Sequence, residues 1–200
     1  MGSIAIIGSA GRGTDARRIS RPLYDAMYAE ALAAVRDFGI DEAVSGGAAF
    51  ADHVAVSLFL DGHVRSLRLF LPAEFDGRAF VPDHRVPNNP GRTANNHHAG
   101  FTAACGIDGL AEIATALSRG AVSSSYRGFK RRNLEVAGHC SHMLAFTFAS
   151  LPTSVFLPGE PGFASPSEAG LKDGGGTAHT WGECWKASWK KHVNLTLLAS

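Results

Sequence analysis

The chain has 200 residues, of which 45% are hydrophobic and 18% are charged, and its net charge is +1. This composition is typical of one globular domain and excludes a disordered or fibrous protein. Nucleic acid is an unfavourable partner for a nearly neutral chain, because the phosphate backbone attracts basic surfaces.

The sequence predicts neither membrane insertion nor secretion. No apolar run reaches the ~20 residues that a transmembrane helix needs. The N-terminal segment MGSIAIIGS has no basic residue before its apolar run, which indicates a strand rather than a signal peptide. The three cysteines have no CxxC spacing, so we expect free thiols in a cytoplasmic protein.

The N-terminal part of the chain alternates between short apolar strands and amphipathic helices. Strands are predicted at 3–7, 42–45 and 67–71. Helical spacing of apolar residues predicts helices from about residue 20 to 38 and over roughly 48–60. Such alternation favours a parallel sheet that is covered on both faces.

The remainder is less regular. Two proline-rich segments, 72–105 and 149–176, are expected to be long loops. The other predicted elements are helices at 107–117 and 129–138, a strand at 143–148, a helix after Thr177 with Trp181, Cys184, Trp185 and Ser188 on one face, and a strand at 192–198. We therefore predict one α/β domain spanning 1–200, with a Rossmann-like parallel sheet of five or more strands and helices on both faces.

Three glycine-bearing turns lie at predicted junctions between strands and helices: GSAGRG at 8–13, SGG at 45–47 and GGGT at 174–177. In an open parallel sheet, ligands bind outside the carboxyl ends of the strands, where the strand order reverses. Glycine lets the backbone approach a ligand, and a helix N-terminus offers unpaired N–H groups to phosphate. The turns therefore predict a phosphate site, although tight turns that need a positive φ would show the same glycines.

Side chains in these turns suit an anion as well. Hydroxyl groups come from Ser9, Thr14 and Thr177, and positive charge comes from arginines at 12, 17 and 18. The first turn reads G-x-x-G-x-G, which is neither the G-x-G-x-x-G of a dinucleotide site nor a P-loop. Ser45, Gly46 and Gly47 follow the second strand, where a dehydrogenase carries an acidic residue, so hydride transfer is disfavoured.

The order of the motifs resembles that of the SLOG superfamily, Rossmann-like domains related to the DNA-processing protein DprA and the cytokinin-activating LOG enzymes. The matching segments are AIIGSAGRG, VSGGAAFADHVAV, KRRNLEVA and GGGTAHT, and the YpsA/YspA-like branch is the most similar. The resemblance implies a small-molecule partner, a nucleotide or an NAD- or ADP-ribose-derived ligand. The implied binding residues are Gly8, Ser9, Gly11, Arg12, Thr14, Ser45, Gly46, Gly47, Asp52, Arg132, Asn133, Gly175, Gly176, Thr177 and Thr180.

The same resemblance favours binding over catalysis. Arg132 matches the arginine in the fourth helix of the LOG enzymes, but Thr180 falls where they carry a catalytic glutamate, and Asp173 replaces a glycine. A threonine cannot stabilise positive charge on ribose during glycosidic cleavage. We therefore expect a protein that senses or sequesters a signalling nucleotide, without catalytic residues, metal or cofactor; a homo-oligomer is compatible with this role.

Two alternatives stay open. One is a nucleoside 5′-monophosphate phosphoribohydrolase or other N-glycosidase, in which Glu183, about one helical turn beyond Thr180, would supply the carboxylate. The other is DNA binding in the manner of DprA, which the near-neutral charge disfavours.

Histidines, cysteines and loop residues suggest further hypotheses. A zinc site is not expected, because no second pair with ligand spacing accompanies Cys140 and His142. Cys105 has no base that the sequence can place beside it. The two long loops are expected to close over the ligand, or else to be surface excursions or a subunit contact. Their candidate ligand-binding side chains are Asn95, Asn96, His97 and His98.

Overall fold

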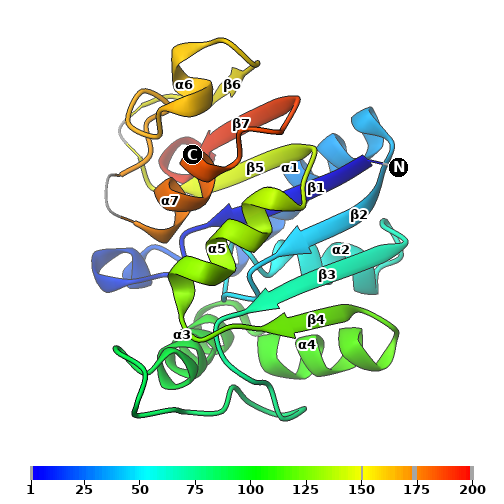
Figure 1. The fold of residues 1–200 in the computed structure, drawn as a ribbon, viewed down its shortest axis with the longest axis vertical. Helices are drawn as coiled ribbons and strands as arrows, with labels where there is room; N and C mark the ends of the chain where they lie inside the picture. The colour runs from blue at the N-terminus through cyan, green and yellow to red at the C-terminus, as the bar shows by residue number, and fades with distance from the viewer. Residues whose placement is uncertain (1, 150, 173–174, 199–200) are drawn as a thin grey trace.

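The computed structural model describes residues 2–149, 151–172 and 175–198. Within them, seven strands form one sheet in the order β4-β3-β2-β1-β5-β7-β6 (Figure 1). The strands are β1 (Gly2–Gly8), β2 (Ile40–Ser45), β3 (Ser66–Leu71), β4 (Val122–Ser125), β5 (His142–Thr147), β6 (Ser154–Phe156) and β7 (Trp189–Asn194). All pair in parallel except β6, which runs antiparallel to β7. The predicted Rossmann-like α/β class is confirmed.

Helices cover both faces of the sheet (Figure 1). One core contains residues of α1 (Arg21–Phe38), α2 (Val54–Leu60), α3 (Pro90–Cys105), α4 (Gly109–Ser118) and the short α8 (Leu195–Leu198). The other contains residues of α5 (Phe129–Gly138), α6 (Pro161–Ala164) and α7 (Gly176–Glu183). Strand β1 supplies both cores, because successive side chains point to opposite faces: Ile4 and Ile6 face the first, Ala5 and Ile7 the second.

The strand order reverses between β1 and β5. The chain builds outward from β1 through β2 and β3 to β4, and then returns to place β5 on the other side of β1. The backbone N–H of Ser9 donates to the carbonyl of Phe146 at 2.9 Å, so the carboxyl ends of the two strands are tied together. Open α/β sheets place their ligand crevice at such a reversal. The first glycine turn therefore leaves the sheet where a ligand is expected.

Local sequence signals explain where several helices begin and end. The side chain of Ser20 accepts a hydrogen bond from the N–H of Leu23, and Gly39 ends α1 with φ of 59°. Helix α5 has the bounds that its apolar spacing predicts. Helix α2 begins at Val54, later than predicted, because the preceding segment turns through Phe50, a non-glycine residue with φ of 64°.

The prediction of a loop through residue 105 is wrong, because α3 occupies its second half. Asn89 caps this helix by accepting from the N–H of Arg92, and Pro90 lies in the first turn. Ala94 and Phe101 are buried in the first core, and this packing outweighs the weak helix propensity of the asparagines and histidines. Segment 149–176 is likewise interrupted by β6 and α6 in its described part.

The C-terminal prediction also needs correction. Helix α7 ends at Glu183, and Trp185 is 73% exposed rather than packed beside Trp181. Strand β7 ends at Asn194, where α8 begins, instead of continuing to residue 198. Strand β4 was not predicted, because its residues VSSS are exposed and carry no apolar pattern.

A buried lysine fastens the segment that carries α6 to α7. The ammonium group of Lys190, on β7, donates to the carbonyls of Phe163 and Trp181 at 2.7 Å each. It also lies 4.3 Å from the ring centroid of Phe163, a cation–π contact. No helix among the described residues is long and apolar enough to cross a membrane.

Candidate functional site

Hydrogen bonds bring the three glycine turns together at the carboxyl ends of β1 and β2. The hydroxyl of Thr177 donates to the carbonyl of Gly8 at 3.1 Å, which joins the start of α7 to the first turn. The amide of Asn133, on α5, donates to the carbonyl of Gly176 at 3.2 Å. The N–H of Gly8 donates in turn to the carboxylate of Asp52 at 3.1 Å. These contacts join parts of the predicted site that are far apart in the sequence.

A buried ion pair lies at the centre of this cluster. Nη1 of Arg132 donates to Oδ2 of Asp52 at 3.2 Å, and the two side chains are only 9% and 5% exposed. Burial lowers the pKa of Arg132 and raises that of Asp52, although the opposite charge of each partner counteracts the shift. Nε of Arg132 is buried without a partner among the described atoms. The pair therefore fixes the second turn against α5 and leaves one guanidinium donor unused.

The protein's own packing accounts for several of the glycines. A Cβ atom on Gly8 would lie 2.2 Å from the carbonyl oxygen of Phe146, and one on Gly47 would lie 2.5 Å from Leu71, at φ of 66°. Of the two, only Gly47 has the positive φ of the tight-turn alternative, whereas Gly8 is required by the close approach of β5. Gly175 and Gly176 differ, because the nearest atoms would lie 3.6 and 3.5 Å away. At these two positions the described atoms would therefore meet a Cβ only in ordinary van der Waals contact. Asp173 and Gly174 lie outside the described residues.

Most of the predicted hydroxyl ligands already have partners in the protein. The hydroxyl of Ser45 donates to the carbonyl of Asp52 at 2.8 Å and accepts from the N–H of Gly47 at 3.1 Å. The hydroxyl of Ser9 donates to Asp15 and accepts from the N–H of Gly11. The hydroxyl of Thr180 bonds back to the carbonyl of Gly176 at 2.9 Å. These groups shape the turns.

The unpaired positive charge of the site comes from Arg12. Its guanidinium lies 5.2 Å from the ring centroid of Phe129, and that of Arg132 lies 5.8 Å from the same ring. Arg12 is exposed, and no acidic partner for it exists within the described part of the chain. Burial, and then the charge of Arg12, lower the pKa of His97. Arg18 points elsewhere, over the ring of Phe148 at 4.0 Å.

Two helix N-termini add to this positive potential. Helix α5 begins after Gly128 and α7 after Gly175, and no side chain caps either of them. The first N–H groups of a helix lack partners within it, and the helix dipole makes this end positive. Because Asn133 links α5 to Gly176, both N-termini belong to the cluster that holds the glycine turns. The arrangement favours an anion with several oxygen atoms, such as phosphate.

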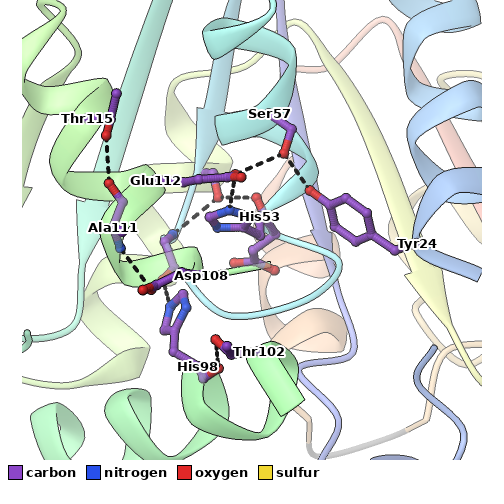
Figure 2. A network of polar contacts seen from close by, with 12 residues as sticks. Tyr24, His53, Ser57, His98, Thr102, Asp108, Ala111, Glu112 and Thr115 are labelled. Atoms are coloured by element: carbon purple, nitrogen blue, oxygen red, sulfur yellow. Dashed lines mark hydrogen bonds and ion pairs between the residues drawn. The ribbon is translucent and has the colours of Figure 1, made fainter. Parts of the chain in front are cut away.

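A polar network connects the second turn (45–47) and the residues after it to helices α3 and α4 (Figure 2). Nε2 of His98, on α3, donates to the carbonyl of Gly47 at 3.1 Å. His53, directly after Asp52, donates through Nε2 to Glu112 on α4 at 2.8 Å. Figure 2 shows Glu112 pointing toward both His53 and Ser57, whose hydroxyl donates to it at 3.3 Å. Burial opposes ionisation of Glu112, but the hydrogen bond and charge of His53 outweigh it and lower the carboxyl pKa.

Two of the ligand-binding side chains predicted in the first long loop, those of Asn95 and His98, bind the protein itself. Asn95 is committed to the backbone of Phe80, whose N–H and carbonyl it binds at 2.9 and 2.8 Å. His98 is 1% exposed and belongs to the supporting network. His97 is the residue of this group whose surroundings include Arg12.

The residues of the metal, cysteine and glycosidase hypotheses lie as follows in the structure. No group of three or more potential metal-ligating residues, among those described, could hold a metal ion. Cys140 and Cys184 do meet, with their sulfur atoms 3.3 Å apart. Cys105 is buried, and burial raises its pKa to about 11. Glu183 is exposed at the far end of α7, about 10 Å along the helix from Gly176.

Comparison with known proteins gives a relative that matches almost from end to end. The "Uncharacterized protein R261" of Acanthamoeba polyphaga mimivirus is 31% identical over 201 residues, which covers 97% of this chain and 96% of that protein. The chain belongs to the family of this viral protein. No protein-family profile matches the sequence, and no solved structure matches it.

Sequence reasoning missed three contributors to this family member's site. Phe129 precedes the basic run that ends at Arg132, and its place beneath Arg12 was not predicted. His53 and Glu112 are 59 residues apart and meet only because α2 packs on α4. A usable signal was that Asp52 and His53 stand within the apolar stretch AAFADHVAV, since acidic residues are rarely buried unless they are paired.

Proposed function

We propose that this chain binds the phosphate groups of a nucleotide or of an NAD- or ADP-ribose-derived ligand, and that it senses or sequesters such a ligand. The observation that carries the proposal is the convergence of two uncapped helix N-termini with an unpaired arginine. Helices α5 and α7 supply the N-termini, and Arg12 supplies the charge. Charge-assisted hydrogen bonds and oriented backbone N–H groups are the donors that phosphate prefers.

The position of the cluster supports the same proposal. It lies where the strand order reverses, the place at which open α/β sheets bind ligands. The order of motifs, which resembles that of the SLOG superfamily, supports a ribose-phosphate ligand in particular.

Binding is favoured over glycosidic hydrolysis by the state of the nearby acids. Hydrolysis needs a carboxylate that can face the developing charge on ribose. Asp52 is paired with Arg132, and Asp15 accepts from Ser9 and lies 3.9 Å from Arg18. Thr180 cannot replace a carboxylate, and its hydroxyl is bonded to the backbone.

Calorimetric titration with pyrophosphate, ADP-ribose and AMP tests the proposal. Arg12→Gln should weaken binding about tenfold, because a single charge-assisted hydrogen bond is typically worth ~1.5–3 kcal/mol. Arg17→Gln is the matched control, since Arg17 is exposed on the same loop and contacts neither Phe129 nor Arg132. Gly175→Val should also weaken binding without unfolding the protein, because its backbone φ of −85° accepts a branched residue. Absence of binding by the unaltered protein to all three ligands would overturn the proposal.

A further inference from the structure

A second hollow lies beside the glycine turns, beyond the carboxyl ends of β3 and β4. It has a volume of about 580 Å³, within the range of small-molecule sites. Its walls come from the segment between β3 and α3 and from the residues that join β4 to α5. Its lining side chains include those of Pro72, Glu74, Val81, Pro82, Val86 and Tyr126.

The hollow is connected to the glycine turns through neighbouring residues. Gly47 packs against Leu71, and the next residue, Pro72, lines the hollow. The N–H of Gly128 donates to the carbonyl of Pro72 at 3.1 Å, and Phe129 follows immediately beneath Arg12. Adjacent strands are separated by about 4.8 Å, so β3 lies only two strand spacings from β1. One nucleotide spans such a distance.

Two arginines of the hollow share one acidic partner. Asp83 accepts from the side chains of Arg85 at 2.9 and 3.1 Å and from Arg127 at 3.3 Å. The side-chain hydrogen bonds of Arg85 lower the pKa of Asp83, so this carboxylate stays charged and paired. The two arginines of the hollow are therefore both engaged with Asp83.

Apart from His84 and Ser125, the remaining side chains of the hollow are apolar groups, Tyr126 and one carboxylate. Pro72, Val81, Pro82 and Val86 present hydrocarbon, and the ring of Tyr126 is held 6.1 Å from that of Phe70. Glu74 is exposed, and within the described residues its carboxylate has neither a hydrogen-bond nor an ion-pair partner. Flat apolar surfaces suit a heterocyclic base, and a free carboxylate accepts hydrogen bonds from ribose hydroxyls.

We infer that this hollow holds the nucleoside of the ligand whose phosphates lie at the glycine turns. The base packs on the proline and valine wall and on Tyr126, and Glu74 accepts from the sugar hydroxyls. The inference rests on the proposed phosphate site, and it assigns the specificity for the nucleoside to segment 72–89 and Tyr126, which lie outside the glycine turns.

The test compares pyrophosphate, adenosine and AMP by calorimetry. Tyr126→Ala and Glu74→Gln should each weaken AMP binding at least about fivefold, on the order of the stacking or hydrogen-bond contribution that they remove. Pyrophosphate affinity should change less than about twofold, the change expected for a site that they do not touch. Tyr126→Phe keeps the ring and should retain AMP binding, and an unchanged pyrophosphate affinity of Tyr126→Ala shows that its loss is not one of folding. Glu168→Gln, an exposed acid elsewhere, is the control for charge.

The outcomes separate the two proposals. The nucleoside assignment is wrong, and the phosphate site stands, if pyrophosphate binds but adenosine does not bind and AMP binds no more tightly than pyrophosphate. The same holds if Tyr126→Ala and Glu74→Gln leave the affinity for AMP unchanged. Equal weakening of pyrophosphate and AMP by Tyr126→Ala also overturns it. If adenosine binds and Tyr126→Ala abolishes this binding, while pyrophosphate does not bind, the phosphate site is contradicted instead. No binding of any of these probes overturns both.

Discussion

The guanidinium of Arg132 occupies the position that a side chain on Gly46 would take. A Cβ atom on Gly46 would lie 1.6 Å from Nη1 and 2.3 Å from Cζ of Arg132. The glycine of the second turn is therefore required by a buried arginine, which approaches the backbone as closely as a ligand phosphate would. Since the same arginine pairs with Asp52, the turn and the ion pair depend on one another.

Gly46→Ala should displace Arg132 from Asp52 and destabilise the protein by roughly 1–3 kcal/mol, the usual cost of overpacking a filled site. It should also weaken phosphate binding, because the second turn moves away from α5. Urea denaturation and calorimetry measure the two effects. Gly100→Ala, on α3 with open space around its Cβ position, is the control; it should preserve phosphate binding and raise stability by up to about 1 kcal/mol. Wild-type stability of Gly46→Ala would show that Arg132 moves aside at little cost.

Asp52→Asn should destabilise the fold by roughly 3–5 kcal/mol, because it leaves the Arg132 guanidinium buried without its counter-charge. The double variant Asp52→Asn/Arg132→Met should regain part of this loss, because the buried charge is removed as well. Denaturant midpoints of the two single variants and the double variant give the coupling energy. Additive effects would mean that the pair contributes no mutual stabilisation.

Stability should fall as the pH decreases from about 6.5 to about 4. Burial, followed by the charge of His53, lowers the pKa of His98 from 6.5 to about 4, and burial lowers that of His192 to about 4. Between these values the unfolded chain binds protons that the folded protein excludes, so each group lowers stability by up to about 1.4 kcal/mol per pH unit.

This stabilisation is complete above pH 6.5 and is lost as the pH falls toward 4. Urea midpoints measured across this interval test the prediction. His98→Gln should flatten the slope, whereas His63→Gln, an exposed histidine, should not. The same slope in His98→Gln and the unaltered protein would contradict the role of His98.

The thiols of the native protein should react slowly with a thiol-specific reagent, because all three cysteines are buried. Burial raises the pKa of Cys105 to about 11, and the hydrogen bond with Cys184, together with burial, raises that of Cys140. Absorbance on adding Ellman's reagent should report all three thiols only after unfolding in guanidinium. A thiol that titrates within seconds in native buffer would contradict the buried arrangement.

The sequence predicted the central sheet well, because buried parallel strands and amphipathic helices have strong apolar patterns. Helix α5, with Val136 and Ala137 on its buried face, matched its predicted bounds. Helix α3 was missed although Ala94, His98, Phe101 and Cys105 recur at helical spacing, because asparagine, glycine and proline dominated the interpretation. Strand β4 could not be predicted, since only its pairing with β3 defines it.

Hydrogen bonds and an ion pair join several of the predicted site residues, but their roles could not be assigned from sequence. Ser9, Ser45 and Thr180 are the residue types that bind phosphate, yet their hydroxyls hold the turns in shape. Whether a glycine faces a ligand, a strand carbonyl or Arg132 depends on tertiary packing. The position expected for the candidate site follows from the topology of the sheet, which the alternation of strands and helices in the sequence encodes.

The pairing of β1 with β5 at the centre of the sheet joins parts of the chain that are synthesised at very different times. Ser3 and Ser141, at the amino ends of β1 and β5, bond across a separation of 138 residues. During synthesis β1, β2 and β3 can pair early, but the other edge of β1 stays unpaired until β5 has emerged. Open apolar edges promote aggregation, and long-range pairing slows folding. Strand β1 is thus the strand that waits longest for its second neighbour, and the proposed ligand site, built on that pairing, can form only after β5 has emerged.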